Sequence, residues 1–216
     1  MERLPSRRRL LAAGLSLAAL AATRPAVAAL APTPRQTAGP FYPAAIPLDS
    51  DADLVTVVGR AERAAGNVAH IFGRVLDPDG RPVEGARVEI WQCDAFGRYH
   101  HSRDPRGPAD PNFQGFGRAT VGSDGGYRFR TIRPVPYPGR TPHIHFAIFA
   151  PGGPPFVTQM YLAGHPLNDG DGVLARVTDA AARARLMVEL RPAPDLEPGA
   201  LGGSFDIVLD RAALGG

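Results

Sequence analysis

The chain has 216 residues and a hydrophobic content of 44%, which suits one compact domain with a buried core and leaves little room for two domains. Its formal charge of +3 comes from arginine alone, since the sequence has no lysine, and most of the arginines are spread along the chain. A nucleic-acid-binding protein needs a clustered basic stripe, so we expect no nucleic acid partner.

The first 28 residues have the pattern of a removable signal peptide. A basic group, SRRRLL at Ser6–Leu11, overlaps the start of an apolar run, Leu10–Ala22, and small residues follow at Ala26–Ala29. The apolar run is too short to span a bilayer and precedes an A-x-A cleavage pattern, so we expect no stable membrane insertion. The paired arginines favour the twin-arginine route over a general secretory signal. The pattern therefore predicts an exported protein, periplasmic or extracellular.

Residues 29–66 are expected to form an extended N-terminal arm. The proline spacing in APTPRQTAGPFYPAAIP, at Ala31–Pro47, forbids a helix. The aromatic pair Phe41 and Tyr42 within it indicates that the arm packs on the rest of the protein. Cys93 is the only cysteine, which excludes an intramolecular disulfide, and its place in a hydrophobic strand predicts a small buried side chain.

Residues 67–216 read as an all-β domain, because short runs with strand character alternate with Asp-Gly and Pro-Gly turn signals. We expect an antiparallel β-sandwich or barrel with long loops. One helix is predicted at Thr178–Leu190, with Thr178 or Asp179 as its N-cap, covering one edge of the β core. The predicted strands are HIFGRVLD, ARVEIWQCD, GFGRATV, YRFRTI, HIHFAIFA, FVTQMYLA and SFDIVLD.

Two histidines lie one residue apart in TPHIHF, at Thr141–Phe146. Residues i and i+2 of a strand share a face, so His143 and His145 point the same way and offer half of a metal site. An iron(II) triad would add a carboxylate, but no Asp or Glu follows until Asp169. A zinc site would need a third histidine. The candidates for that third ligand are His70, His100, His101 and His165.

Two tyrosines offer a different completion of the site. Tyr99 ends EIWQCDAFGRY, and Tyr137 lies six residues before His143. Phenolate ligation removes a proton from a group with a pKa of about 10, so it requires a hard, strongly Lewis-acidic ion such as ferric iron. Tyr127 and Tyr161 lie in strand patterns and are expected only to pack.

Several segments, in order over nearly the whole chain after residue 28, resemble the intradiol ring-cleavage dioxygenase family, in particular its protocatechuate 3,4-dioxygenase branch. The segments are TPRQTAGPFYP, GRVLDPDGRPVEGARVEIWQCDAFGRYHH, DPNFQGFGRATVGSDGGYRFRTIRPVPYPGR, TPHIHFAIFAP, VTQMYLAGHPL and FDIVL. This resemblance implies that residues 67–216 form an intradiol dioxygenase domain with an all-β fold, an antiparallel β-sandwich that is transthyretin/prealbumin-like.

The resemblance also implies a site and a reaction. It places the ligands of a non-haem Fe(III) ion on Tyr99, Tyr137, His143 and His145. It places a catalytic arginine on Arg140 and a glutamine near the substrate on Gln159, and it implies that the tyrosinate at position 137 leaves the metal and takes up a phenolic proton. The implied substrates are a small aromatic diol and O2, and the ring opens between its hydroxyls to a cis,cis-muconate-type diacid.

The sequence departs from the family pattern in two places. Between Tyr137 and His143 the branch usually carries a longer loop with a tryptophan, so one wall of the substrate pocket is expected to be shorter here. The catechol and hydroxyquinol branch begins with a helical dimerisation domain, which the Pro-rich arm cannot form. A homo-oligomer is still compatible with the sequence, through the arm or an uncovered sandwich edge. The substrate is left open among protocatechuate, catechol, hydroxyquinol and substituted catechols.

A non-catalytic binding module is the strongest alternative. GRVLDPDGRPVEGARVEI followed by SDGGYRFRTI is a pattern that transthyretin-like and carboxypeptidase-regulatory-like sandwiches share. That reading accounts for the fold. It does not account for the combination of Tyr99, Tyr137, Arg140, His143 and His145.

Overall fold

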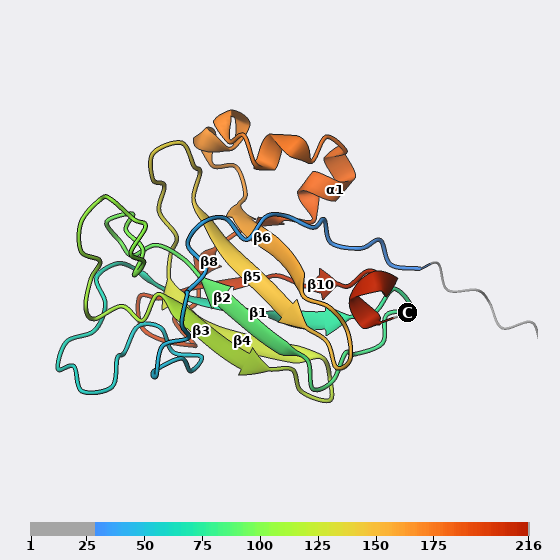
Figure 1. The fold of residues 1–216 in the computed structure, drawn as a ribbon, viewed down its shortest axis with the longest axis horizontal. Helices are drawn as coiled ribbons and strands as arrows, with labels where there is room; N and C mark the ends of the chain where they lie inside the picture. Colours follow the sequence, from blue (N-terminus) through green and yellow to red (C-terminus); the bar gives the residue numbers. More distant parts are fainter. Residues whose placement is uncertain (1–28, 216) are drawn as a thin grey trace, which may run out of the picture.

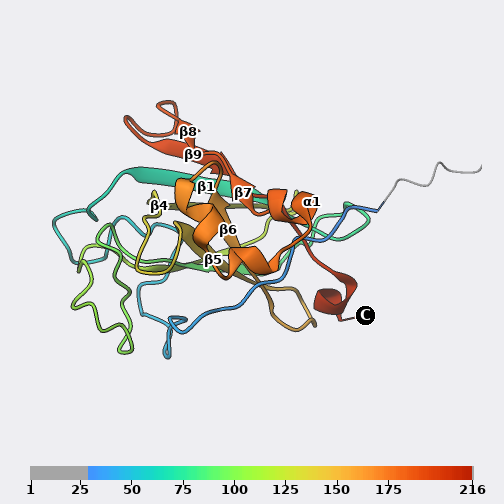
Figure 2. The same cartoon turned by 90° about the horizontal axis from the view of Figure 1, so that it is seen from above.

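Two β-sheets packed face to face form the body of the protein (Figure 1), seen as separate layers in Figure 2. The structure is a computed structural model that describes residues 29–215. The predicted signal peptide, residues 1–28, lies outside the described residues. The two packed sheets confirm the predicted β-sandwich.

In the first sheet the strand order is β10-β1-β9-β8, and β4 also pairs with β1. In the second sheet the strand order is β3-β2-β5-β6-β7. The strands of the first sheet are β1 (Val68–Leu76), β4 (Gly126–Ile132), β8 (Arg191–Pro192), β9 (Leu201–Ser204) and β10 (Ile207–Val208). Those of the second are β2 (Arg87–Trp91), β3 (Phe116–Thr120), β5 (His143–Phe149), β6 (Phe156–Leu162) and β7 (Met187–Val188).

Both sheets are mixed, whereas the sequence predicted an antiparallel sandwich. The long neighbours β1 and β4, β2 and β5, and β5 and β6 are antiparallel. The short strands β9 and β10 both run parallel to β1, and β7 runs parallel to β6. Segments that return from the loops thus add short parallel pairs to an antiparallel framework.

The segment SFDIVLD, predicted as one strand, is divided between β9 and β10. At the break, Phe205 donates its backbone N–H to Phe72 O, and the Asp206 side chain accepts from Arg74 N–H. A Cβ added at Gly73 would lie 2.2 Å from the Phe205 carbonyl oxygen, so the two backbones approach each other more closely than a side chain would allow.

The predicted helix at Thr178–Leu190 is much shorter than expected. The α-helix α1 covers Ala180–Ala184, and Asp179 caps it by accepting from Ala182 N–H. Leu186 is fully buried and its carbonyl accepts from Tyr161 N–H, and β7 follows directly. Burial of these apolar side chains beside β6 therefore outweighs the helix propensity of the alanines. Short 3₁₀ helices lie at η1 (Pro166–Gly170), η2 (Leu174–Arg176) and η3 (Arg211–Leu214).

A large hydrophobic core fills the space between the sheets, and a smaller one lies on the outer face of the second sheet. Ile144, Phe146 and Ile148 of β5 belong to the large core. Trp91, Cys93, Tyr99, Phe116 and Ala147 form the smaller core, with Phe41, Tyr42, Tyr137 and other partly buried side chains packed against it. The outer face of the second sheet is therefore covered as well.

The N-terminal arm covers this outer face, and it appears as the blue segment crossing β5 and β6 in Figure 1. Gln36 N–H donates to Val157 O at 2.8 Å, and the Thr158 hydroxyl donates to Pro34 O at 2.7 Å. Phe41 and Tyr42 lie against the smaller core, as predicted. The arm thus covers part of β6.

Cys93 is free and buried, as predicted, and burial raises the pKa of its thiol to about 12. Among residues 29–215, every helix is too short or too polar to cross a lipid bilayer.

Candidate metal centre

The register of the second sheet brings the predicted site residues onto its outer face. His145 of β5 pairs with Trp91 of β2 on one side and with Gln159 of β6 on the other. His143 pairs with Tyr161. Because alternate residues of a strand share a face, these side chains lie together in two adjoining rows under the arm. The intervening Ile144 points into the large core.

The two histidines face each other through their Nε2 atoms, which are 3.2 Å apart. His143 Nδ1 lies 2.7 Å from the Thr141 carbonyl oxygen. A carbonyl only accepts, so Nδ1 carries the hydrogen and Nε2 keeps its lone pair, which is the tautomer of a metal ligand. The His145 ring stacks on Trp91, with centroids 4.8 Å apart and planes 4° from parallel.

Tyr99 reaches the histidines from the loop that follows β2. Asp104 holds its backbone by accepting from Tyr99 N–H at 2.7 Å. The ring stacks on Phe41 of the arm with a centroid distance of 4.6 Å. Its hydroxyl is buried and has no hydrogen-bond partner among the described residues.

Tyr137 comes from a tight turn just before β5. Tyr137 N–H and Arg140 N–H each donate to the other residue's carbonyl, and Gly139 between them has φ +81°. Pro followed by Gly at the two central positions is the signature of a type II turn, so YPGR folds back locally. The Tyr137 ring lies 5.5 Å from the His143 ring and 5.8 Å from the Tyr99 ring. The structure therefore brings Tyr99, Tyr137, His143 and His145 together.

Burial keeps all four of these side chains neutral. It lowers the pKa of His143 to about 3 and that of His145 well below its usual value. It also raises the pKa of Tyr99 well above 10.0 and raises that of Tyr137. A buried phenol without a partner is unfavourable, and it becomes an anionic ligand only if a strongly Lewis-acidic cation replaces its proton. Two neutral imidazoles, the phenol of Tyr99, unpartnered among the described residues, and the phenol of Tyr137 together fit a trivalent metal ion.

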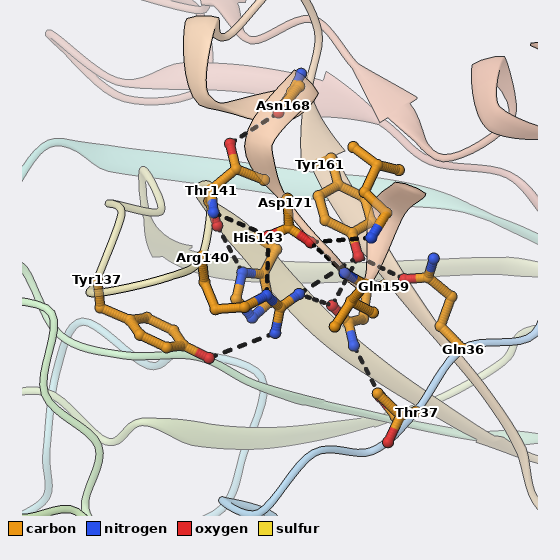
Figure 3. Close-up of polar contacts among 12 residues, drawn as sticks. Gln36, Thr37, Tyr137, Arg140, Thr141, His143, Gln159, Tyr161, Asn168 and Asp171 are labelled. Atoms are coloured by element: carbon orange, nitrogen blue, oxygen red, sulfur yellow. Dashed lines mark hydrogen bonds and ion pairs between the residues drawn. The ribbon is translucent and has the colours of Figure 1, made fainter. Parts of the chain in front are cut away.

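Arg140 lies beside this group, in the polar cluster drawn in Figure 3. Its Nη1 donates toward the Tyr137 hydroxyl at 3.5 Å, and its Nη2 donates to Gln159 Oε1 at 2.6 Å. Gln159 Nε2 in turn donates to Thr37 O of the arm at 2.8 Å. The structure thus also brings Arg140 and Gln159 to the four side chains.

Several residues of the cluster were not predicted from the sequence as site residues, among them Tyr161, Gln36 and Asp171. Tyr161 was expected only to pack, and this was wrong, because its hydroxyl contacts both Gln159 and Gln36 of the arm. Asp171 accepts from Arg140 Nε at 2.8 Å. The alternation of β6 offered a signal for Tyr161, two residues after Gln159, but Gln36 and Asp171 lie in segments without periodicity. Tyr127 packs against Phe129 and Phe146, as expected, and its hydroxyl also donates to Phe205 O, away from the site.

The other histidines make separate contacts. His100 Nε2 donates to Asp110 O, and His101 Nδ1 accepts from Arg103 N–H. His165 lies beside the Thr141 hydroxyl, and His70 lies 3.3 Å from a Glu197 oxygen. In the described part of the chain, no three or more His, Cys, Asp or Glu side chains form a group that could hold a metal ion. These residues therefore do not form a zinc site with a third histidine.

Two cavities border the tyrosines of the site, one beside Tyr137 and the other beside Tyr99. One, of about 150 Å³, is lined by Tyr137, Gly139, Arg140, Leu167 and Asp171, with two further residues. The other, of about 210 Å³, lies on the far side of Tyr99, between the arm and β3. The short turn before His143 forms one wall of the first cavity, so Arg140 and Tyr137 face a small open space.

Comparisons with known proteins agree with this geometry. A family model described as "Dioxygenase" matches residues 37–211. The chain is 42% identical over 168 residues to the protocatechuate 3,4-dioxygenase beta chain of Burkholderia cepacia, covering 74% of this chain and 71% of that one. It is 34% identical to the hydroxyquinol 1,2-dioxygenase of Nocardioides simplex, covering 79% of this chain and 62% of that protein.

Solved structures show the same fold. The dioxygenase domain of a dioxygenase carbohydrate-binding protein fusion from Streptomyces sp. SirexAA-E superposes with a TM-score of 0.65 at 32% identity, over 83% of this chain and 99% of that one. Catechol 1,2-dioxygenase from Acinetobacter sp. ADP1 superposes with a TM-score of 0.64 at 28% identity, over 82% of this chain and 62% of that one. The chain belongs to the intradiol ring-cleavage dioxygenase family.

Proposed function

We propose that this protein is a non-haem ferric dioxygenase that opens the ring of a small aromatic diol between its two hydroxyls, using O2. Tyr99, Tyr137, His143 and His145 would hold the iron. Bound there, ferric iron would supply a Lewis acid and a template for the two oxygens of the diol. The product would be a cis,cis-muconate-type diacid.

The side chains of the site have separate roles in this proposal. The Tyr137 oxygen takes up a phenolic proton from the diol as the substrate binds. The Arg140 guanidinium stabilises negative charge that develops on the ring oxygen, as a fixed cation beside a reacting group does. Gln159 contacts the substrate and holds Arg140 Nη2 through its Oε1. The arm and the Trp91 ring shield the site from water.

One observation carries the proposal: two histidine Nε2 atoms face each other at 3.2 Å beside a buried tyrosine hydroxyl that has no partner among the described residues. A binding module has no use for such a group, because an unsatisfied buried hydroxyl lowers stability by about 1–3 kcal/mol. A metal ion that all the facing donors can bind removes this penalty.

Oxygen uptake tests the activity. Purified protein loaded with iron is given catechol, protocatechuate, hydroxyquinol and substituted catechols in turn, and the products are separated. We expect uptake of one O2 per diol for at least one compound, with a diacid as product. No uptake with any compound, in protein that retains bound iron, would favour the non-catalytic binding module.

The proposal includes the localisation of the protein outside the cytoplasm. The basic and apolar pattern of residues 1–28 supports export by the twin-arginine route. That route carries folded proteins, which suits an enzyme that acquires its iron before export. A homo-oligomer would be formed through the arm or a sandwich edge.

A further inference from the structure

Asp171 lies in the loop after η1 and presents a carboxylate to the site. Its side chain is 0% exposed. One oxygen accepts from Arg140 Nε at 2.8 Å and Thr141 N–H at 3.0 Å, and the other accepts from Val173 and Leu174 N–H, both at 2.9 Å. Both oxygens are thus fully used by donors from two segments of the chain.

The carboxylate is ionised although it is buried. Burial opposes its ionisation, but hydrogen bonds from Leu174 N–H, Arg140 and Thr141 N–H outweigh that effect and lower the pKa of Asp171. A buried charge requires a partner, and Arg140 supplies the opposite one at contact distance. The two residues therefore form one neutral unit inside the protein.

This unit fixes the direction of the guanidinium. Asp171 binds Nε, Gln159 binds Nη2, and Nη1 is left toward the Tyr137 hydroxyl. A guanidinium is planar, so holding Nε and Nη2 determines where Nη1 points. Without the Nε contact, the side chain of Arg140 could turn about its long axis.

The same carboxylate reaches one of the histidines through the backbone. It holds Thr141 N–H, and the carbonyl of Thr141 accepts from His143 Nδ1 at 2.7 Å. Thr141 is held further by its hydroxyl, which donates to Asn168 at 2.8 Å. The orientation of His143 therefore depends on a residue that Asp171 holds in place.

Resting on the proposed function, we infer that Asp171 is a positioning residue of the reaction. It aims the guanidinium of Arg140 at the place where charge develops on the substrate. Asp171 does not touch the substrate's reacting atoms. Its effect on turnover is transmitted through Arg140.

A double-mutant cycle separates this role from a structural one. Asp171→Asn is made in the wild type and in Arg140→Gln. Asp169→Asn is the matched control, since Asp169 lies two residues earlier, in η1, with a side chain 100% exposed. Circular dichroism and the thermal unfolding midpoint report folding, and kcat and KM are measured with the best diol from the panel.

We expect Asp171→Asn to lower kcat by about 10–100-fold, the usual effect of removing a supporting residue of a metal site, with a much smaller change in KM. In the Arg140→Gln background the same change should alter kcat by less than about twofold. Asp169→Asn should leave kcat unchanged. An equal fall in both backgrounds, or no fall in either, would overturn the inference.

A second measurement needs neither iron nor turnover. In ¹⁵N NMR of the metal-free protein, the Arg140 Nε hydrogen should exchange slowly compared with that of the exposed Arg63, and Asp171→Asn should abolish this protection. If Asp171→Asn does not fold, the wild-type exchange rate decides, and an Arg140 Nε hydrogen as labile as that of Arg63 refutes the inference. Protection in a protein that consumes no O2 with any diol would refute the proposed function and support the positioning by Asp171.

Discussion

Gly39 shows how closely the arm approaches the site at the level of a single residue. It has φ +67°, and a Cβ added there would lie 3.3 Å from His145 Cε1. Positive φ is unfavourable for other residues, and the contact with the imidazole adds a steric restriction. Gly39 therefore allows the arm to lie directly against a proposed iron ligand.

Replacing Gly39 should disturb both stability and the site. Gly39→Ala and the control Gly59→Ala both place alanine at positive φ, but a Cβ at Gly59 has nothing within 4 Å. We expect each to lower the free energy of unfolding by about 1–2 kcal/mol in urea titrations. Only Gly39→Ala should reduce the iron bound after reconstitution. Equal iron contents in the two variants would mean that the arm does not press on His145.

At the residue scale, the sequence predicted the site where a local pattern existed. The spacing of His143 and His145 placed both on one face of a strand, and the structure confirms this. The turn that carries Tyr137 and Arg140 was contained in four adjacent residues. Asp171 was missed because it follows Arg140 by 31 positions, in a loop whose path depends on the packing of η1 and η2.

At the element scale, a charged cluster outside the site joins β1 and β4 to the loop before β9. It contains His70 of β1, Arg128 and Arg130 of β4, and Glu197 of that loop. Arg130 donates to both Asp53 and Glu197, and His70 lies between Arg128 and Glu197. Burial, and then the charge of Arg128, lower the pKa of His70. Hydrogen bonding by Arg130 lowers the pKa of Glu197 to about 2. The cluster is thus built for neutral His70 and ionised Glu197.

This cluster should make stability fall in acid. In the folded protein the pKa of His70 is lower than its usual value of about 6.5, which applies in the unfolded chain. The unfolded state therefore takes up the proton first, and the stability present above about pH 6.5 is lost as the pH decreases, by at most about 1.4 kcal/mol per pH unit. Urea unfolding between pH 7.5 and pH 5 measures the slope. His70→Gln should make the slope shallower, and an unchanged slope would contradict the assignment.

Element positions were well predicted where strands are long, because alternation and turn residues specify them locally. The six strands β1 to β6 lie within the predicted runs or extend them by no more than two residues. The helix predicted at Thr178–Leu190 starts at its predicted N-cap but ends at Ala184, and SFDIVLD is divided between two strands and was wrong as a single strand. In both places burial against distant strands, or a close approach of two backbones, overrides the local preference.

At the scale of the whole molecule, the arm completes the site from the beginning of the described chain. At one end of the arm, Pro34 and Gln36 contact β6, and further along the chain Phe41 stacks on Tyr99. The sequence predicted that the arm packs, through its aromatic pair, but gave no register against β6, because the contacts join positions more than 120 apart. A chain that folds its own arm onto the sheet therefore encloses the proposed iron site by itself.

The visible absorption spectrum of the iron-loaded protein tests the central claim most directly. A ferric ion held by Tyr99 and Tyr137 should give a red-brown protein, through charge transfer from tyrosinate to iron, and added catechol should shift the band. Tyr99→Phe and Tyr137→Phe should each change the spectrum. A colourless protein that holds stoichiometric zinc or no metal, or a spectrum that neither substitution alters, would contradict the account.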